Sequence, residues 1–252
     1  MKAEKKILPD ISNHKYTVQI AQTDAEVEEA LKLRYEVFYE ELEREFEAAD
    51  HIDRDQYDDQ CHHLIVKENK SGDVVGTYRL QTYEQAVNGN GFYSESLFHL
   101  EDLPNEVLAQ SFEVGRACIE EKHRSGRVLF LLWKGFAGYL QSFQKRYLLG
   151  SLGIPAASPE EGKAIYKKYL DDGVIHEDFQ VSAKEPYRQH LSDIKIHKKE
   201  HFEGPGLLQN YLSVGCDIIS KPAYHKELEL LYVMIFLDIE HISDRTRKMF
   251  FG

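Results

Sequence analysis

One continuous stretch, Ser111 to Pro155, contains the patterns of a strand, a buried helix and a second strand in that order. The helical part, Val128 to Phe143, is apolar on almost every side. Its polar residues recur every seven residues as one narrow stripe, formed by Arg127, Lys134 and Gln141. Apolar runs at 112–119 and 147–154 flank this helix. A strand, a helix and a strand in succession imply two neighbouring parallel strands.

Further strands and helices surround this unit. The other predicted strands cover residues 16–21, 62–67, 74–81, 217–220 and 230–239, and the other predicted helices run from Thr23 to about Phe46, over 159–170 and over 207–214. This order predicts an α/β protein with a mixed sheet and helices on both faces. We expect one domain over residues 1–252. Residues 173–206, rich in His and Lys and with little periodicity, predict an insertion or flap.

Charge is distributed unevenly along the chain. Residues 24–59 carry fifteen acidic side chains against four basic ones, a local charge of −11 in a chain of net charge −12. Residues 122–146 carry six Lys or Arg and no Asp or Glu. The acidic total disfavours nucleic acid as a partner, and the basic segment favours an anionic partner or a phosphate. Solvated helix faces are the alternative interpretation of both segments.

Other sequence features limit the possible functions. The first fifteen residues lack the apolar core of a signal peptide, and the longest apolar run is broken by Lys134, so we expect a cytoplasmic protein without a membrane span. Cys61, Cys118 and Cys216 are too scattered for a metal cluster or a disulfide framework. The histidine spacing is equally poor for a metal, and we expect none.

Two charges interrupt the apolar run before the long helix. Glu113 and Arg116 lie where a packed strand would not tolerate charge without partners, which makes both residues candidates for chemistry. They are three residues apart and would point to opposite sides of an ideal strand. Gly115 between them is a candidate for a β-bulge that re-aims one of the two side chains.

Five short motifs in the same order carry a resemblance to a known family. They are Arg34-Tyr-Glu-Val-Phe38, Asp55-Gln-Tyr-Asp58, Gly76-Thr-Tyr-Arg-Leu80, Gly91-Phe-Tyr-Ser94 and Glu113-Val-Gly-Arg116. The series resembles the acyl-carrier-protein-dependent branch of the GNAT acyltransferases, and within it the ornithine-lipid type of N-acyltransferase, also labelled hemolysin-like. Acyl-homoserine lactone synthases are similar in the same places. The resemblance covers roughly Ala21 to Ile239.

The resemblance implies a GNAT fold in which the strands on either side of the long helix splay apart and leave a cleft for the pantetheine arm of an acyl donor. Backbone groups of Val114, Gly115 and Ala117 would then bind the pantetheine amides and polarise the thioester oxygen. No cofactor is implied, because the donor is a substrate: an acyl carrier protein thioester or an acyl-coenzyme A.

The loop before the long helix bears on the choice between these donors. GNAT enzymes usually place a glycine-rich loop here that holds the coenzyme A pyrophosphate at a helix N-terminus. In this chain His123-Arg-Ser-Gly126-Arg-Val128 keeps one glycine and has valine at the second small position. Arg124, Gly126 and Arg127 are the implied donor-binding residues. The altered loop favours acyl carrier protein, whose acidic surface the basic segment could meet.

The implied reaction is transfer of a long-chain, 3-hydroxylated acyl group to the amine of an amino acid such as ornithine or glycine. The resemblance implies Glu113 as general base, with Arg116 beside it and Tyr166 as the acid that protonates the leaving thiolate. The implied acceptor-binding residues are Arg34, Asp55, Asp58 and Arg79.

Each assignment has a structural alternative. Glu113 could form an ion pair with Arg79 or Arg116, Asp55 and Asp58 could belong to a solvated loop, and Tyr166 or its neighbour Tyr169 could simply pack. Two other functions also stay open: a coenzyme A-dependent acetyltransferase or acyltransferase acting on a small amine, and a non-catalytic GNAT-like binding module. Peripheral membrane association through a lipid product is a further expectation.

Overall fold

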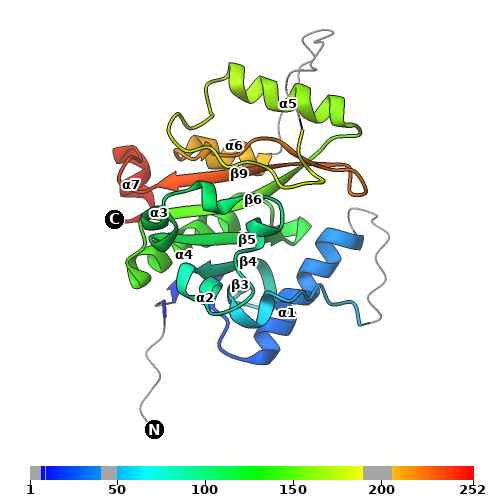
Figure 1. Cartoon of the computed structure of the whole chain (residues 1–252). Helices are drawn as coiled ribbons and strands as arrows, with labels where there is room; N and C mark the ends of the chain where they lie inside the picture. The colour runs from blue at the N-terminus through cyan, green and yellow to red at the C-terminus, as the bar shows by residue number, and fades with distance from the viewer. Residues whose placement is uncertain (1–6, 9, 41–49, 190–205) are drawn as a thin grey trace. The chain divides into compact units, whose positions relative to one another are not determined.

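The computed structural model describes residues 7–8, 10–40, 50–189 and 206–252 (Figure 1). The chain divides into two compact units. The first unit contains the described residues up to Asn90 together with Val114–Lys145 and Lys248–Gly252, and the second contains Gly91–Glu113 and Arg146–Arg247. The predicted mixture of helices and strands is confirmed. The assignment of all 252 residues to one domain stays a prediction.

Strands of the first unit form an antiparallel meander. Its strands are β1 (Ile11–Ser12), β2 (Tyr16–Ile20), β3 (His62–Glu68) and β4 (Val74–Thr82), and the later part of β5 (Ser111–Ile119) lies beside β4. The register of β3 and β4 pairs His63 with Arg79 and Leu64 with Tyr78. A turn at residues 70–73 joins these two strands, as the sequence predicts, and Gly72 takes a φ of +85° there.

Helices of the first unit cover both faces of this meander. They are α1 (Asp24–Tyr35), a π-helix (Glu36–Glu40), α2 (Tyr83–Val87), α4 (Arg127–Phe143) and two 3-10 turns, Asp58–Gln60 and Glu121–His123. The alternation of β4 shows which face each long helix covers. Tyr78 packs edge-on against Phe136 of α4, whereas the next residue, Arg79, shares the carboxylate of Asp58 with Arg34 of α1. The two long helices therefore lie on opposite faces.

The predicted start of the first helix is confirmed, and the helix changes type within its predicted length. Thr23 caps α1 by accepting a hydrogen bond from the backbone N–H of Glu26. The regular α-helix ends at Tyr35 and continues as the π-helix, because the backbone hydrogen bonds shift to a wider spacing. The rest of the predicted helix, up to Phe46, falls largely outside the described residues.

The second unit contains the predicted pair of parallel strands. The first residues of β5 pair in parallel with β6 (Tyr147–Pro155) through three residue pairs, the last of which joins Glu113 to Leu149. β6 continues antiparallel to β9 (Leu230–Asp238), which also pairs with β7 (Asp217–Ile218) and β8 (Ala223–His225). The parallel neighbours expected from the strand, helix and strand order are thus confirmed. Their parting beyond Glu113 stays a prediction.

Helices of the second unit agree with the sequence patterns where predictions were made. They are α3 (Asn105–Ala109), α5 (Pro159–Asp171), α6 (Gly206–Ser213), 3-10 turns at Tyr93–Ser96 and Leu100–Asp102, and the start of α7 (Asp244–Phe250). The predicted flap is described up to residue 189 and from Gly206. Its described part is packed, since Val181 and Ala183 are buried and form β-bridges with Ser220 and Phe98. Its remainder lies outside the described residues.

Within the first unit, close packing of α4 on the sheet depends on a small residue in β4. A Cβ atom added to Gly76 would lie 2.6 Å from Cγ1 of Val128, which is fully buried in the first turn of α4. Val128 cannot swing away easily, because a β-branched side chain has one strongly preferred rotamer in a helix. Glycine at position 76 therefore sets the distance between α4 and β4.

We predict that Gly76→Ala lowers the free energy of unfolding by about 1–3 kcal/mol through overpacking. Urea denaturation would measure the change. The matched control is Gly115→Ala, because a Cβ atom at Gly115 meets no atom within 4 Å. In a Val128→Ala background the cost of Gly76→Ala should shrink, since the clashing methyl group is gone. An equal cost in both backgrounds would contradict this account of the packing.

Candidate functional site

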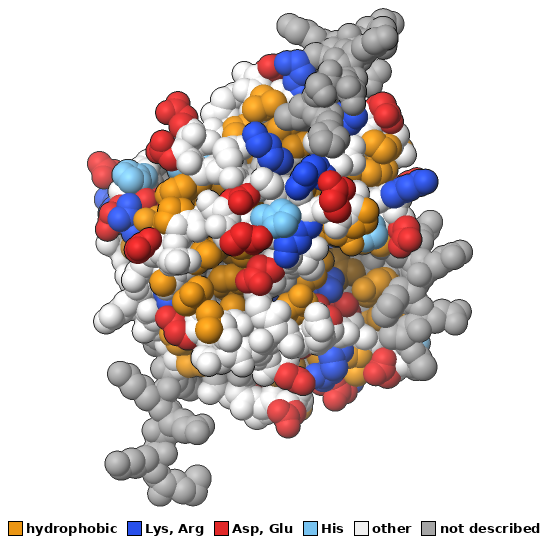
Figure 2. Space-filling model, in the orientation of Figure 1, with side chains coloured by type: hydrophobic (Ala, Val, Ile, Leu, Met, Phe, Trp, Pro, Cys, Tyr) orange, Lys and Arg blue, Asp and Glu red, His pale blue; other side chains and the backbone are white. Residues whose placement is uncertain are grey.

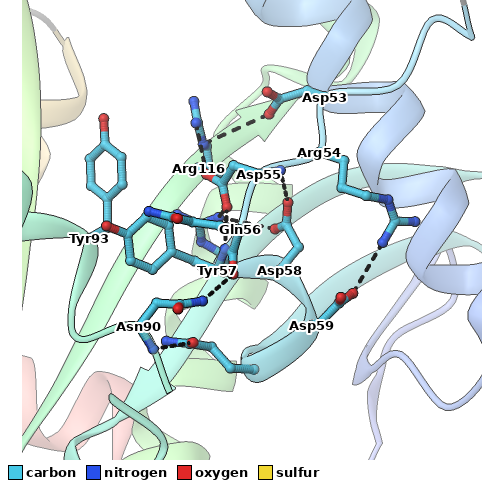
Figure 3. A network of polar contacts seen from close by, with 12 residues as sticks. Asp53, Arg54, Asp55, Gln56, Tyr57, Asp58, Asp59, Asn90, Tyr93 and Arg116 are labelled. Atoms are coloured by element: carbon cyan, nitrogen blue, oxygen red, sulfur yellow. Dashed lines mark hydrogen bonds and ion pairs between the residues drawn. The ribbon is translucent and has the colours of Figure 1, made fainter. Parts of the chain in front are cut away.

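Three arginines and three aspartates of the first unit form one network of ion pairs. Figure 3 shows its members Asp53, Asp55, Asp58 and Arg116. Arg34 donates from Nε to Asp53 at 2.6 Å and from Nη1 to Asp58 at 2.6 Å. Arg79 Nη1 donates to Asp58 at 3.1 Å and to Asp55 at 2.5 Å. Positive and negative groups thus alternate along the network, and each buried carboxylate has a guanidinium partner.

Arg116 closes the network at its other end. Its Nη2 donates to Asp55 at 3.0 Å, and its Nε lies 3.8 Å from a carboxylate oxygen of Asp53. The structure therefore brings together all five predicted residues of this set from four separate parts of the chain: α1, the loop at 53–58, β4 and β5. The interpretation of Asp55 and Asp58 as a solvated loop is wrong for Asp58, which is buried.

Exposure differs sharply along the network. The side chains of Arg34, Asp58 and Arg79 are 5% exposed or less, whereas those of Arg116 and Asp55 are 25% and 21% exposed. The inner groups are locked by one another, and the outer pair can meet a molecule from solvent. A guanidinium and a carboxylate side by side match a ligand that carries both a carboxylate and an ammonium group.

The loop from Asp53 to Asp58 is shaped by its own side chains. Asp58 accepts a hydrogen bond from the backbone N–H of Asp55 at 2.8 Å, and Asp55 accepts one from the backbone N–H of Tyr57 at 2.9 Å (Figure 3). Such local bonds are typical of Asp in turns. They fix both carboxylates before any ligand arrives. The ring of Tyr57 also lies 5.4 Å from the Arg79 guanidinium.

Electrostatics keep Asp55 and Asp58 ionised. Burial by itself would raise the pKa of Asp58, but Arg34 and Arg79 outweigh burial and lower that pKa to about 2. Burial is likewise the largest single influence on Asp55 and would raise its pKa. Arg79, the backbone N–H of Tyr57 and Arg116 together outweigh burial, so the pKa of Asp55 is also lowered. Burial lowers the pKa of His63, whose Nε2 lies 3.2 Å from the carbonyl oxygen of Asp58.

Asp53 belongs to the network but is absent from the set of residues predicted from the sequence. It joins Arg34 to Arg116 and also accepts a hydrogen bond from the Tyr39 hydroxyl at 3.2 Å. A signal was present, because Asp53, Asp55 and Asp58 stand together in a nine-residue charged segment. Its burial, at 3% exposed, depends on contacts with α1 and β5 that sequence spacing does not reveal.

The backbone of β5 is irregular at Arg116. This residue takes a φ of +51°, in the left-handed region that is costly for a side chain other than glycine. The backbone irregularity thus lies at Arg116 and not at Gly115, and the predicted re-aiming of a side chain stays a prediction. Gly115, Arg116 and Ala117 are half-buried, whereas Val114 before them is buried. Their role in donor binding stays a prediction.

Glu113 lies in the second unit and is 4% exposed. Its two carboxylate oxygens accept hydrogen bonds from the backbone N–H groups of Tyr93 and Ser94, each at 2.8 Å. Arg79 and Arg116, the arginines considered as its ion-pair partners, bind Asp55. The carboxylate of Glu113 thus holds the turn that begins the 3-10 helix at Tyr93–Ser96. Its assignment as general base stays a prediction.

Tyr166 is buried in α5 of the second unit. Its hydroxyl donates a hydrogen bond to the carbonyl oxygen of Ser220 at 2.7 Å, and burial raises its pKa to about 12. The Tyr169 hydroxyl is also buried and has no hydrogen-bond partner among the described residues. Burial raises the pKa of Tyr169 to about 12 as well. The hydroxyl of Tyr166 therefore forms a buried hydrogen bond within the second unit. Its role as an acid stays a prediction.

The predicted basic segment does not form one surface. Arg124, Gly126 and Arg127 are exposed at the start of α4, where Gly126 takes a φ of +84° and Arg124 donates to the carbonyl oxygen of Ile119. Lys145, beyond the other end of that helix, is 5% exposed and pairs with Glu84 at 2.6 Å. Arg146 pairs with Asp238 through two hydrogen bonds. Lys145 therefore cannot contribute to a docking surface.

The depressed pKa of Asp58 makes a prediction about acid stability. A group whose pKa is lower in the folded state stabilises the fold above its unfolded pKa, here 3.8, and the stabilisation is lost as the pH falls through about 2. Over that interval we expect the free energy of unfolding of wild type to fall by on the order of 2 kcal/mol relative to that of Asp58→Asn. Urea denaturation between pH 5 and pH 2 would measure it.

At neutral pH the same Asp58→Asn variant should be less stable by about 3–5 kcal/mol, because it leaves the buried Arg34 short of a partner. The control is Asp59→Asn, whose side chain is 92% exposed and whose change should hardly matter at any pH. A constant difference between wild type and Asp58→Asn from pH 5 to pH 2 would contradict the assignment.

Comparison with known proteins agrees with this geometry. A GNAT acetyltransferase domain matches residues 33–134, which include all six residues of the network. The structures of the acyl-homoserine lactone synthase LasI and of the coenzyme A-dependent synthase BjaI have TM-scores of 0.50 and 0.53 to this chain. LasI is 14% identical to this chain, and the match covers 94% of this chain and 95% of LasI. BjaI is 15% identical, and the match covers 90% of this chain and 81% of BjaI. These likenesses show that the fold is of the GNAT type.

Two relatives are closer in sequence. The L-ornithine N(alpha)-acyltransferase of Brucella abortus is 30% identical over 246 residues, which are 90% of this chain and 86% of that protein. The protein of the same name from Rhizobium meliloti is 31% identical over 241 residues, 90% of this chain and 81% of the relative. The chain therefore belongs to the L-ornithine N(alpha)-acyltransferase family of GNAT acyltransferases.

Proposed function

We propose that this acyltransferase moves a fatty acyl group from a thioester donor to the α-amine of ornithine, the first step in the synthesis of an amino-acid lipid. The observation that carries the proposal is the outer pair of the network, Arg116 and Asp55, partly exposed at the end of an otherwise buried set of charges. The two relatives, both L-ornithine N(alpha)-acyltransferases, support ornithine as the acceptor.

The outer pair would bind the two charged groups that every α-amino acid carries. The Arg116 guanidinium offers planar donors to the carboxylate, and Asp55, ionised at neutral pH, attracts the ammonium group. Arg34, Arg79 and Asp58 would hold these two residues in place from behind without touching the substrate. This division explains why the inner charges are buried and the outer ones are not.

Acyl transfer forms one bond and breaks another. The amine loses a proton and attacks the thioester carbonyl carbon, a C–N bond forms, and the C–S bond breaks to release the donor's thiol. Backbone N–H groups near the irregular residue Arg116 are candidates for stabilising the oxyanion that develops on the carbonyl oxygen. The same β5 segment would then serve both substrates.

Ornithine differs from most amino acids by a second ammonium group on its side chain. The acidic segment at residues 24–59, with a local charge of −11, favours such a dication over a neutral amino acid. On the face that Figure 2 shows, acidic and basic side chains are interspersed, so the acidic excess does not gather there as one large patch.

We further propose acyl carrier protein as the donor. Arg124 and Arg127 are exposed at the start of α4 and are the part of the basic segment that can meet an acidic protein. A coenzyme A-dependent reaction is the alternative, and Gly126 in its left-handed conformation retains one feature of a phosphate-binding loop. In either case the reaction would take place in the cytoplasm, where both donors are found.

Peripheral membrane association is a further proposal. In the described part of the chain no helix is long and apolar enough to cross a membrane. Phe130 of α4 and Met249 near the chain's last described residue are 39% and 37% exposed. The Lys134 ammonium lies 5.5 Å from the Phe130 ring. An aromatic and cationic surface of this kind suits the interface of an anionic bilayer.

The acceptor assignment predicts that Arg116→Gln raises KM for ornithine by roughly 10- to 100-fold, because a charge-assisted pair of hydrogen bonds is lost. KM for the acyl donor should change little. The matched control is Arg54→Gln in the same loop region, since Arg54 forms an exposed ion pair with Asp59 and should leave both constants unchanged. Steady-state kinetics with each substrate varied in turn would measure these effects.

A substrate change tests the same contact from the other side. The diamine that lacks the carboxylate of ornithine should be a poor acceptor for wild type, and Arg116→Gln should make it no worse. If wild type acylates the diamine as well as ornithine, no carboxylate is recognised and the acceptor assignment is wrong.

The donor assignment predicts a selective effect of charge reversal. The double variant Arg124→Glu and Arg127→Glu should lower kcat/KM for acyl carrier protein and should spare a minimal acyl-pantetheine donor, which needs no docking surface. The wild-type rate with the carrier protein should also fall with added salt, because screening acts over about 8 Å at physiological ionic strength.

The control for this prediction is Lys70→Glu, an exposed residue in the turn between β3 and β4 that should leave the carrier-protein reaction unchanged. If acyl-coenzyme A of equal chain length reacts as well as acyl carrier protein, and charge reversal affects neither selectively, the coenzyme A reaction replaces the proposal.

A further inference from the structure

Glu113, Ser94 and Ser151 form a chain of hydrogen bonds in the second unit, called the clasp below. Ser94 is fully buried and makes two contacts there: its backbone N–H donates to Glu113 of β5 at 2.8 Å, and its hydroxyl lies 2.6 Å from the hydroxyl of Ser151 on β6. The last pair of the parallel ladder joins Glu113 to Leu149, two residues before Ser151. Ser94 therefore connects the two strands at the end of their ladder.

The turn that carries Ser94 is fixed from several directions. The Glu95 carboxylate accepts the backbone N–H of Phe92 at 3.2 Å, and the Ser96 hydroxyl donates to the carbonyl oxygen of Tyr93 at 2.7 Å. Gly91 takes a φ of +79°, and a Cβ atom on it would lie 2.7 Å from Glu95. Glu113 supplies the link between this turn and the sheet, through two backbone N–H groups.

This use of the Glu113 carboxylate conflicts with a role as general base. Both oxygens accept a backbone N–H, and a proton taken from the amine would remove the negative charge that strengthens both of these hydrogen bonds. A charge-assisted hydrogen bond would be lost in every catalytic cycle. A carboxylate that accepts two backbone hydrogen bonds of a fixed turn is suited to holding that turn and not to proton transfer.

We propose that Glu113 is a positioning residue that acts through Ser94 to place the half-buried hydroxyl of Ser151 against the acyl donor, and that it does not deprotonate the amine; this inference rests on the proposed acyl transfer. The hydroxyl groups of Ser94 and Ser151 carry no charge, so they fit the amide and thioester groups of the donor better than the ammonium and carboxylate of the acceptor. The acceptor's charges have their partners in Asp55 and Arg116.

Two positions test the proposal: Glu113→Gln and Ser151→Ala, singly and together. Each single change should raise KM for the acyl donor, by roughly 10- to 100-fold for Glu113→Gln because one acceptor oxygen is replaced by an amide group. KM for ornithine should be unchanged. The double variant should be little worse than the more impaired single variant, because both changes break the same clasp.

The pH profile separates the two roles of Glu113. At higher pH the amine loses its proton in solution and no longer needs a base on the enzyme. If Glu113 were that base, the ratio of wild-type to Glu113→Gln activity would therefore shrink between pH 7 and pH 9.5. A lost positioning residue gives a constant ratio. A shrinking ratio, or effects of the two substitutions that multiply, would overturn the proposal.

Two further outcomes are decisive. A variant that merely lost folded protein would show a lower maximal rate with an unchanged donor KM, and this result would also overturn the proposal; circular dichroism would give the folded fraction. If Glu113→Gln does not fold, Ser151→Ala carries the test alone, since its half-buried position on β6 tolerates alanine. Wild-type turnover, measured first, tests the proposed function separately.

Discussion

The buried ion pairs of Arg34 with Asp53 and Asp58 are the constraint on which the first unit depends. A charge in a protein interior is tolerated only with its partner in place, and loss of one partner is far more costly than the pair itself is stabilising. The network therefore fixes α1, the loop at 53–58 and β4 as a set. Arg116 and Asp55 come to the surface because the inner charges are already matched.

Glu113 is held by a different solution to the same problem. Asp58 accepts hydrogen bonds from the guanidinium groups of Arg34 and Arg79 and from the backbone N–H of Asp55, whereas Glu113 accepts two from the backbone N–H groups of Tyr93 and Ser94. A guanidinium group that pairs with a carboxylate of the network can also bind a charged group of a ligand. Backbone N–H partners instead fix the course of the chain. The two carboxylates are buried to a similar extent. Their partners differ, so Asp58 holds a charged network together and Glu113 holds a turn of the chain.

Charges that are close in sequence can have unrelated environments. Arg127 is exposed at one end of α4, while Lys145 beyond the other end is buried against Glu84. A helix of seventeen residues separates them by about 25 Å, at 1.5 Å per residue. A run of basic residues in a sequence is thus not a basic surface, and charge arguments about a partner need the exposed members alone.

The sequence by itself determined the order of the main elements and the family resemblance. Its periodic apolar pattern gave α4 between the parallel neighbours β5 and β6, and Thr23 marked the start of α1, because burial and capping are read within a few residues. The tertiary structure alone decided the partners. Asp53, the hold of Glu113 on Ser94 and the bond from Tyr166 to Ser220 each depend on segments 19 to 54 residues apart, and no local pattern encodes which of them meet.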